Sequence, residues 1–260
     1  MRIISLYSIK GGVGKSSASV NLAYCASQDG NRTLLIDLDP LGASSYCFKV
    51  QPKPKHSAKT LVKGGKGLLK NIRESDYPGL DLLPASFSYR SLDFLLDEKK
   101  HAHSRLRTTL EPLETLYDTL IIDCTPSLTL LSENVLRASD LVLVPNVPTT
   151  LSMLAYEKLL EQLTIMEVEK NRIHQFLSMV DKRKKLHVQL SQEIEGRSDV
   201  LETSIPYCTE IEKMGVYREP VVCMQPSSRG AKAFVALWKE VDELCTKEGV
   251  LHSAVRERIL

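Results

Sequence analysis

Residues 10–17 read Lys10-Gly11-Gly12-Val13-Gly14-Lys15-Ser16-Ser17, and this stretch decides the fold. It follows an apolar run, Arg2–Ile9, that is typical of a buried strand, and it leads into a predicted helix, Ser16–Ser27. Glycines let the chain turn tightly and point successive backbone N–H groups at phosphate oxygens, and the helix start adds the positive end of its dipole. The order of these features predicts a phosphate-binding loop, the alternative being a chance glycine-rich turn.

The side chains of this loop have separate expected roles. Lys15 is predicted to reach the β and γ phosphates of a nucleotide, and Ser16 to supply a hydroxyl to Mg²⁺. The general pattern G-x-x-x-x-G-K-[ST] has a glycine where this chain has Ile9, and Lys10 comes next. The loop is therefore a deviant version with an additional lysine. From the residues alone, Lys10 is either a ligand contact or an exposed loop lysine.

Further apolar runs alternate with helical patterns along the chain. The predicted strands are Arg2–Ile9, Arg32–Asp37, Leu80–Pro84, Thr119–Cys124, Leu141–Pro145, Ile173–Val180 and Val200–Ile205. The predicted helices are Ser16–Ser27, Leu128–Ala138, Ser152–Lys170, Lys184–Glu195 and Ala231–Thr246. Nearly continuous apolar strands that alternate with helices predict an α/β fold, with a doubly wound, mostly parallel sheet between two helical layers. We expect a single domain over 1–250, with a surface excursion at about 44–79 containing at most one short helix, and a C-terminal tail at 251–260.

Three aspartates stand at the ends of predicted strands. Asp123 ends an apolar strand, and Asp37 and Asp39 follow the strand before it in sequence. In a parallel sheet these ends meet at one edge, so we expect Asp37 and Asp123 to hold Mg²⁺ together with Ser16. No histidine lies in these segments, so a carboxylate is expected to orient the attacking water, and Asp39 is the candidate. The alternative is that these acids cap helices or turns.

Composition excludes several classes of protein. The chain is 43% hydrophobic and 25% charged with a formal net charge of +2, which is typical of a globular protein. It has neither an apolar run of about 18 residues nor the pattern of a secretory signal, so we expect a cytoplasmic protein. The six cysteines form no CxxC pair and no Cys/His cluster. They are therefore expected to be reduced, mostly buried thiols rather than disulfides or ligands of zinc or iron–sulfur clusters.

The small net charge hides a basic segment. Residues 49–73 contain eight cations and no acid: Lys49, Lys53, Lys55, Lys59, Lys63, Lys66, Lys70 and Arg73. The remaining 26 of the 34 basic residues are outnumbered by 32 acids, so the rest of the chain is acidic. Such a segment is either a polyanion-binding surface or an ordinary solvated one.

The series of motifs resembles the ParA/MinD family of ATPases. Residues 10–17 resemble the deviant Walker A loop of that family, and Asp37-Leu38-Asp39-Pro40 its D-x-D-P switch. The Walker B segment is matched by Ile121-Ile122-Asp123-Cys124-Thr125-Pro126-Ser127-Leu128, and the late ParA landmarks by Ser204-Ile205-Pro206 and Pro226-Ser227-Ser228-Arg229-Gly230-Ala231. Their order covers nearly the whole chain, and the match is closest to ParA proteins without an N-terminal DNA-binding extension.

The resemblance implies an ATP- and Mg²⁺-dependent homodimer that binds two ATP molecules between its subunits. The nucleotide then contacts Lys10, Gly11, Gly12, Val13, Gly14, Lys15, Ser16 and Ser17, with Pro206 and, more weakly, Met179 beside the adenine. Lys10 reaches the partner's phosphates, and Asp39 positions the hydrolytic water. A cation supplied across the dimer neutralises charge that develops on the γ-phosphate, which couples dimerisation to hydrolysis.

The resemblance also implies non-specific binding to double-stranded DNA on the nucleoid. The matching basic run is Lys182, Arg183, Lys184 and Lys185, in which Arg183 aligns with a DNA-contacting arginine of the family, and Arg218 and Arg229 are secondary candidates. Two departures are that Leu41 replaces a usual glutamine and that Glu210 reverses the charge at a DNA-contact position. A ParB-like or other adaptor would stimulate slow hydrolysis. The cargo would be a plasmid, a chromosome origin or, in view of the departures, a protein assembly.

Two alternative functions are less well supported by the residues. A MinD-like membrane ATPase needs a basic amphipathic C-terminal helix, and residues 251–260 offer only a short, weak version of one. An ATP-dependent metabolic ligase shares the phosphate loop but needs a substrate pocket, for which we find no candidate residues. The first reading is therefore a ParA-like ATPase without membrane attachment.

Overall fold

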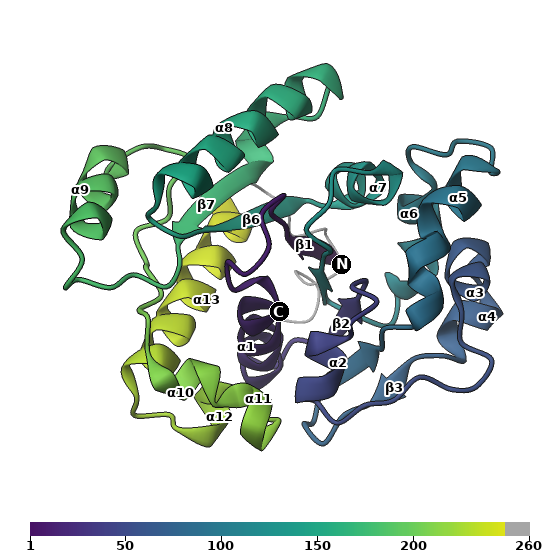
Figure 1. Cartoon of the computed structure of the whole chain (residues 1–260). Helices are drawn as coiled ribbons and strands as arrows, with labels where there is room; N and C mark the ends of the chain where they lie inside the picture. The colour runs from purple at the N-terminus through teal and green to yellow at the C-terminus, as the bar shows by residue number, and fades with distance from the viewer. Residues whose placement is uncertain (248–260) are drawn as a thin grey trace.

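A computed structural model of the chain describes residues 1–247 and shows one seven-stranded sheet between helical layers (Figure 1). The strand order is β3-β4-β2-β5-β1-β6-β7, and all neighbours pair in parallel except β3 and β4, which are antiparallel. The strands are β1 (Arg2–Leu6), β2 (Thr33–Asp37), β3 (Arg73–Glu74), β4 (Leu80–Leu83), β5 (Thr119–Asp123), β6 (Leu141–Asn146) and β7 (Ile173–Leu177). This arrangement confirms the predicted doubly wound, mostly parallel α/β fold.

Helices cover both faces of the sheet. The longer ones are α1 (Lys15–Gln28), α7 (Leu130–Ala138), α8 (Thr150–Ile165), α9 (Lys185–Ile194) and α13 (Arg229–Lys247). The shorter ones are α2 (Ala43–Cys47), α3 (Ala58–Lys63), α4 (Lys66–Leu69), α5 (Leu92–Asp97), α6 (Arg105–Leu110), α10 (Thr209–Glu212), α11 (Met214–Tyr217) and α12 (Val221–Met224). Short 3₁₀ turns occur at Phe87–Ser91, Glu111–Leu113 and Lys170–Arg172.

The core is divided into two clusters by the sheet. Successive side chains of a strand point to opposite faces, so Ile3 packs with α3 to α8, whereas Ile4 packs with α1 and α11 to α13. On the second face Trp238 of α13 is fully buried, and its indole N–H donates to Asp29 at 2.6 Å. Burial on both faces explains why the strands are continuous apolar runs.

The register of the central strands positions the site. Asp37 at the end of β2 lies opposite Asp123 at the end of β5, and Asp123 lies opposite Leu6 at the end of β1. The loop after β1 leads directly into α1. The carboxyl ends of three neighbouring strands therefore meet beside the phosphate-binding loop.

The predicted strand Val200–Ile205 is absent from the structure. This segment meets the sheet only through isolated bridges, Gln175 with Val200 and Val180 with Pro206. Between them, the backbone N–H groups of Glu202 and Thr203 donate to the carboxylate of Glu240 on α13 instead of to a neighbouring strand. A carboxylate 37 or more positions away in sequence thus accepts hydrogen bonds that a neighbouring strand would otherwise accept. No local sequence pattern predicts this contact.

The segment 44–79 is more ordered than the sequence analysis predicted. It contains most of α2, together with α3, α4 and the edge strand β3, where at most one short helix was expected. Leu61, Val62 and Leu68 are buried in the same core cluster as α5 and α6. Helices of four to six residues are too short to display a 3.6-residue period, which is why the pattern was missed.

Within residues 1–247, no helix is long and apolar enough to cross a membrane. The predicted C-terminal tail, 251–260, lies outside the described residues. Four of the six cysteines, Cys25, Cys124, Cys208 and Cys245, are buried, in agreement with the prediction of mostly buried thiols, and Cys47 and Cys223 are partly exposed.

Candidate functional site

The loop after β1 has the geometry of an anion cradle. Gly12 and Gly14 adopt left-handed backbone conformations, with φ of +71° and +94°. Gly14 caps α1, and no side chain caps this helix end, so its first N–H groups are available to an anion. A Cβ on Gly14 would lie 2.9 Å from Ser178 Oγ, so glycine is required there for space as well as for conformation.

Lys15 points into this cradle. Its side chain is buried, and its Nζ donates to the carbonyl oxygen of Lys10 at 3.3 Å. Burial lowers the pKa of Lys15, and the nearby charge of Asp123 opposes that shift. A buried ammonium with only a long hydrogen bond to a backbone carbonyl is an electrostatic site for phosphate.

Two fully buried carboxylates lie next to the loop. Asp123 Oδ2 accepts a hydrogen bond from Ser44 Oγ at 2.6 Å, and Asp37 Oδ2 accepts from Ser45 through its backbone N at 2.8 Å and its Oγ at 2.7 Å. Burial and the charge of Asp123 raise the pKa of Asp37 to about 7, against the hydrogen bonds from Ser45. Burial also raises the pKa of Asp123, against the hydroxyls of Ser44 and Ser16 and the charge of Lys15.

An unpartnered atom makes this edge suitable for a metal ion. Asp123 Oδ1 is buried and has no hydrogen-bond partner, which is costly unless a cation or a donor meets it. Carboxylate and hydroxyl oxygens are the ligands that Mg²⁺ prefers, so Asp123 and Ser16 fit this ion. Residues 1–247 contain no cluster of three His, Cys, Asp or Glu side chains that would hold a metal alone, so a bound ion would take further ligands from phosphate and water.

Asp39 and Lys10 lie at the rim of the site. Asp39 is partly exposed, and its Oδ1 accepts from the backbone N–H of Leu41 at 2.9 Å. Lys10 Nζ turns away from its own loop and donates to Ser152 Oγ on α8 at 2.7 Å and to Thr149 Oγ1 at 3.4 Å. The structure therefore brings Asp39 to the edge with Asp37 and Asp123, but places the Lys10 ammonium against α8.

A small apolar cavity adjoins the cradle. It measures about 50 Å³, and its walls include Pro206 and Met179, the two predicted adenine neighbours, together with Gly14, Ser17 and Tyr207. Met179 has a left-handed backbone with φ of +54°, which turns the chain out of the sheet beyond β7. The late segment around Pro206 is thus next to the loop although about 190 residues separate them in sequence.

The predicted DNA-binding residues differ in their surroundings. Lys182, Arg183, Lys184 and Lys185 are all exposed, just before and at the start of α9, and Arg183 is paired with Asp181 through two 2.9 Å contacts. Hydrogen bonds from Arg183 lower the pKa of Asp181 to about 2.

The two secondary DNA-binding candidates, Arg218 and Arg229, each lie close to another residue. Arg218 packs on α2, with its Nε 2.9 Å from the Tyr46 carbonyl oxygen and its guanidinium 4.4 Å from the Tyr46 ring centre. The pKa of Glu210 on α10 is lowered mainly by hydrogen bonds from its own backbone and from Cys208, with a further contribution from the charge of Arg229. Arg229 is therefore close to the acid that reverses the charge at this position.

Ser44 and Ser45 of α2 belong to the site although no motif in the sequence indicated them. Their hydroxyls hold the two buried carboxylates, and Ser45 Oγ also accepts from the backbone N–H of Ala85 at 2.9 Å. Asp123 is 79 positions from Ser44, so no local motif could have revealed the contact. Only the proximity of two serines to the D-x-D-P segment was a signal.

Comparison with known proteins identifies the family. A family model described as an AAA domain matches residues 1–179. The sporulation initiation inhibitor protein Soj of Bacillus subtilis is 30% identical over 247 residues, which cover 92% of this chain and 98% of Soj. The chain belongs to the ParA/MinD family of P-loop ATPases. The chromosome partitioning protein ParA of Myxococcus xanthus is 28% identical over 250 residues, covering 92% of this chain and 87% of that protein.

Solved structures agree with this family at the level of the fold. The septum site-determining protein MinD of Pyrococcus horikoshii, complexed with Mg-ADP, superposes with a TM-score of 0.77 over 97% of this chain and 99% of that one, at 23% identity. Cobyrinic acid a,c-diamide synthase of Mycobacterium smegmatis, with a bound ATP analogue and magnesium, gives 0.78 over 96% and 97%, also at 23% identity. Both confirm a ParA/MinD-like P-loop fold, and both hold an adenine nucleotide with magnesium.

Proposed function

We propose that this chain is a ParA-like ATPase that uses ATP and Mg²⁺ to switch a homodimer on and off DNA and so partitions or positions a cargo. The observation that carries this proposal is the cradle of Gly12, Gly14 and Lys15 beside the unpartnered oxygen of Asp123. Members of the family are ATPases, and the matched relatives are named as partitioning proteins and as a cell division protein.

The residues of the cradle have distinct roles in this proposal. The backbone N–H groups of residues 11–17 and the ammonium of Lys15 bind the phosphates, and Pro206 and Met179 flank the adenine. Ser16 and Asp123 hold Mg²⁺, which neutralises phosphate charge when bound, and Asp37 supports them from the adjacent strand. Asp39 at the rim accepts a hydrogen bond from the hydrolytic water and orients it.

A second subunit fits the exposed edge of this site. Large apolar side chains that follow the carboxyl ends of the strands are exposed: Leu41 after β2, Phe87 after β4, Leu128 after β5, and Leu151 and Leu154 after β6. Such exposure around one edge is typical of a surface that a partner covers. Lys10, whose ammonium already points away from its own loop, then reaches the phosphates of the partner subunit.

DNA binding in this proposal uses the exposed cations at the start of α9. Lys182, Lys184 and Lys185 contact phosphates without reading bases, and Arg183 joins them when it leaves Asp181. Arg229 and Arg218 contribute less, because Arg229 faces Glu210 and Arg218 packs on Tyr46. An adaptor of the ParB type stimulates hydrolysis, which returns the protein from the nucleoid to the cytoplasm.

The proposal is tested by the ATP dependence of binding to double-stranded DNA at two salt concentrations. We expect MgATP to induce salt-sensitive binding, Lys15→Ala to abolish it because the phosphates lose their cation, and Asp39→Ala to prolong it because hydrolysis stops. Lys239→Ala, at an exposed position of α13 outside the cavity, serves as a control that should behave as the parent. ATP binding without any effect on DNA binding would contradict the proposal, and sedimentation with liposomes would then test membrane attachment.

A further inference from the structure

The basic segment found in the sequence forms a lysine face on α3 and α4, which lie together beyond the β3 edge of the sheet (Figure 1). We define this face by its exposed side chains Lys53, Lys59, Lys63, Lys66 and Lys70. Lys59 and Lys63 are four residues apart on α3, so they lie on the same side of that helix. Lys53 Nζ donates to the Lys70 carbonyl oxygen at 2.6 Å, which ties the preceding loop to the end of α4.

No acid neutralises this face among the described residues. The segment contains no Asp or Glu, and its single ion pair within residues 1–247 joins Lys49, which lies outside the face, to Glu219 at 3.4 Å. Like charges four residues apart destabilise a helix, and α3 carries Lys59 and Lys63 at this spacing nonetheless. The face is therefore a concentrated positive surface on an otherwise acidic chain.

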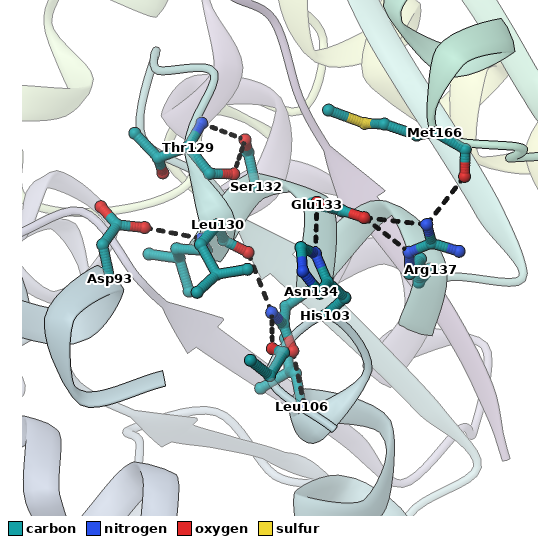
Figure 2. Close-up of polar contacts among 12 residues, drawn as sticks. Asp93, His103, Leu106, Thr129, Leu130, Ser132, Glu133, Asn134, Arg137 and Met166 are labelled. Atoms are coloured by element: carbon teal, nitrogen blue, oxygen red, sulfur yellow. Dashed lines mark hydrogen bonds and ion pairs between the residues drawn. The ribbon is translucent and has the colours of Figure 1, made fainter. Parts of the chain in front are cut away.

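Helices α3 and α4 pack in one core cluster with α5 and α6, which α7 holds by hydrogen bonds (Figure 2). Asn134 of α7 donates to the Ala102 carbonyl oxygen at 2.6 Å and accepts from the backbone N–H of Leu106 at 3.0 Å, which fixes α6. Asp93 of α5 accepts from the backbone N–H of Leu131 at 2.7 Å. Arg105 of α6 in turn donates to the Val62 carbonyl oxygen of α3 at 3.3 Å. Lys59, Lys63 and Lys66 are thus carried by helices that pack on their neighbours, and Lys53 and Lys70, just outside these helices, are joined to each other.

The composition of the face distinguishes between classes of partner. Residues 49–73 contain no Phe, Tyr or Trp, and no large apolar side chain is exposed between Tyr46 and Phe87. Protein interfaces are enriched in aromatic residues and depleted in lysine, and single-stranded nucleic acids stack on aromatic rings. Lysines alone, as flexible point charges, suit the evenly spaced phosphates of a duplex.

We propose that the lysine face binds double-stranded DNA through its phosphates, independently of sequence and of ATP. It lies at the β3 edge of the sheet, whereas the 182–185 run follows β7 at the opposite edge. The face is complete within one chain, and none of its residues lines the cavity beside the phosphate loop. One subunit thereby holds two separate DNA-contacting surfaces, of which only the one on α9 depends on the nucleotide; this inference rests on the proposed function for the choice of DNA as the polyanion.

The test measures binding of the full chain to a fluorescent duplex without nucleotide over a range of salt concentrations. The variant replaces Lys63, Lys66 and Lys70 by Gln, and a matched control replaces the exposed Lys158, Lys170 and Lys239 by Gln, which changes the net charge equally. We expect the face variant to bind on the order of tenfold more weakly at low salt and to lower the slope of log K against log salt by roughly two to three, while the control changes little. Equal melting temperatures would show that both variants fold.

Each other outcome has a defined meaning. Equal affinities and salt slopes for the face variant and the control would overturn the inference. Binding of poly-L-glutamate as tight as binding of the duplex, lost equally in the face variant, would also overturn it and indicate an acidic protein partner. If ATP-induced binding disappears with Lys184→Gln and Lys185→Gln while nucleotide-free binding is the same in the face variant and its control, the proposed function stands and this inference fails. If ATP does not change DNA binding but nucleotide-free binding is weakened in the face variant, this inference stands and the proposed function fails.

Discussion

At the scale of single residues, the candidate site depends on how buried carboxylates are stabilised. Asp37 and Asp123 are fully buried on adjacent strands, and such charges are costly unless hydrogen-bonded. Ser44 and Ser45 on α2 supply these hydrogen bonds. One oxygen of Asp123 is left without a partner, and this is the atom that we assign to Mg²⁺. The serines therefore position the carboxylates.

Ser44→Ala is expected to destabilise the protein in the absence of Mg²⁺ and nucleotide. Asp123 would lose its hydrogen bond from Ser44 while it stays buried, and leaving a buried acceptor unsatisfied costs about 1–3 kcal/mol. Urea unfolding at neutral pH measures the change. Ser139→Ala is the control, because its buried hydroxyl donates to the Val135 carbonyl oxygen of α7, the helix that it follows directly. Equal stabilities of Ser44→Ala and the parent would refute a positioning role for Ser44.

At the scale of elements, short helices such as α10 pack against the long helices that cover the sheet. The longest helix, α13, crosses one face of the sheet and presents Phe234, Leu237 and Trp238 to the core. Its start packs closely against α10, since a Cβ on Gly230 would lie 2.9 Å from Ile211 Cγ1 and 3.0 Å from Cys208 Sγ. This contact joins the late segment beside the cavity to the helix layer.

Gly230→Ala is expected to destabilise the protein by about 1–3 kcal/mol, because the added methyl group overpacks the contact between α13 and α10. Gly215→Ala in α11 is a matched control, since its Cβ would meet nothing within 4 Å and alanine favours a helix by up to about 1 kcal/mol. Denaturant unfolding compares the two. Ile211→Ala in the Gly230→Ala background should recover part of the loss. Additive effects of those two substitutions would show that the contact is not the cause.

At the scale of the whole molecule, the sheet edge that carries the phosphate loop has the features of a surface that a partner covers. Exposed leucines surround it, and the Lys10 ammonium is held against Ser152 instead of over its own loop. A second copy placed over this edge would bury the leucines and receive Lys10. Each catalytic site would then receive Lys10 from the other subunit, which would make hydrolysis a property of the dimer.

Mixing two inactive variants tests this arrangement. Lys10→Ala lacks the cation donated to the partner, and Asp39→Ala lacks the group that orients water in its own site, so each homodimer should be inactive. A heterodimer keeps one complete site, so equimolar mixing before ATP is added should restore about a quarter of the parent turnover. Phosphate release measures the rate. A mixture as inactive as its components would show that Lys10 acts within its own subunit.

Much of the fold and part of the site were predictable from the sequence. Long apolar strands and helices can be predicted from their periodicity. The phosphate loop and its aspartates can be predicted because they follow strands in an order that few folds allow. The short helices α3 and α4 were missed because too few residues are present to show a period. Val200–Ile205 was wrongly predicted as a strand because Glu240 accepts the hydrogen bonds of Glu202 and Thr203 in the middle of that segment. The serine partners of the carboxylates were missed because hydrogen-bond partners far apart in sequence leave no local trace.

What the sequence by itself determined is the family, the doubly wound sheet and the loop that binds phosphate, because each depends on local patterns of glycine, charge and apolar residues. The tertiary structure alone decided which oxygen of Asp123 stays free, where the Lys10 ammonium points and that the lysines of α3 and α4 stand opposite those of α9. These features depend on which strands are neighbours and on contacts between distant residues. Such contacts exist only once the chain has packed.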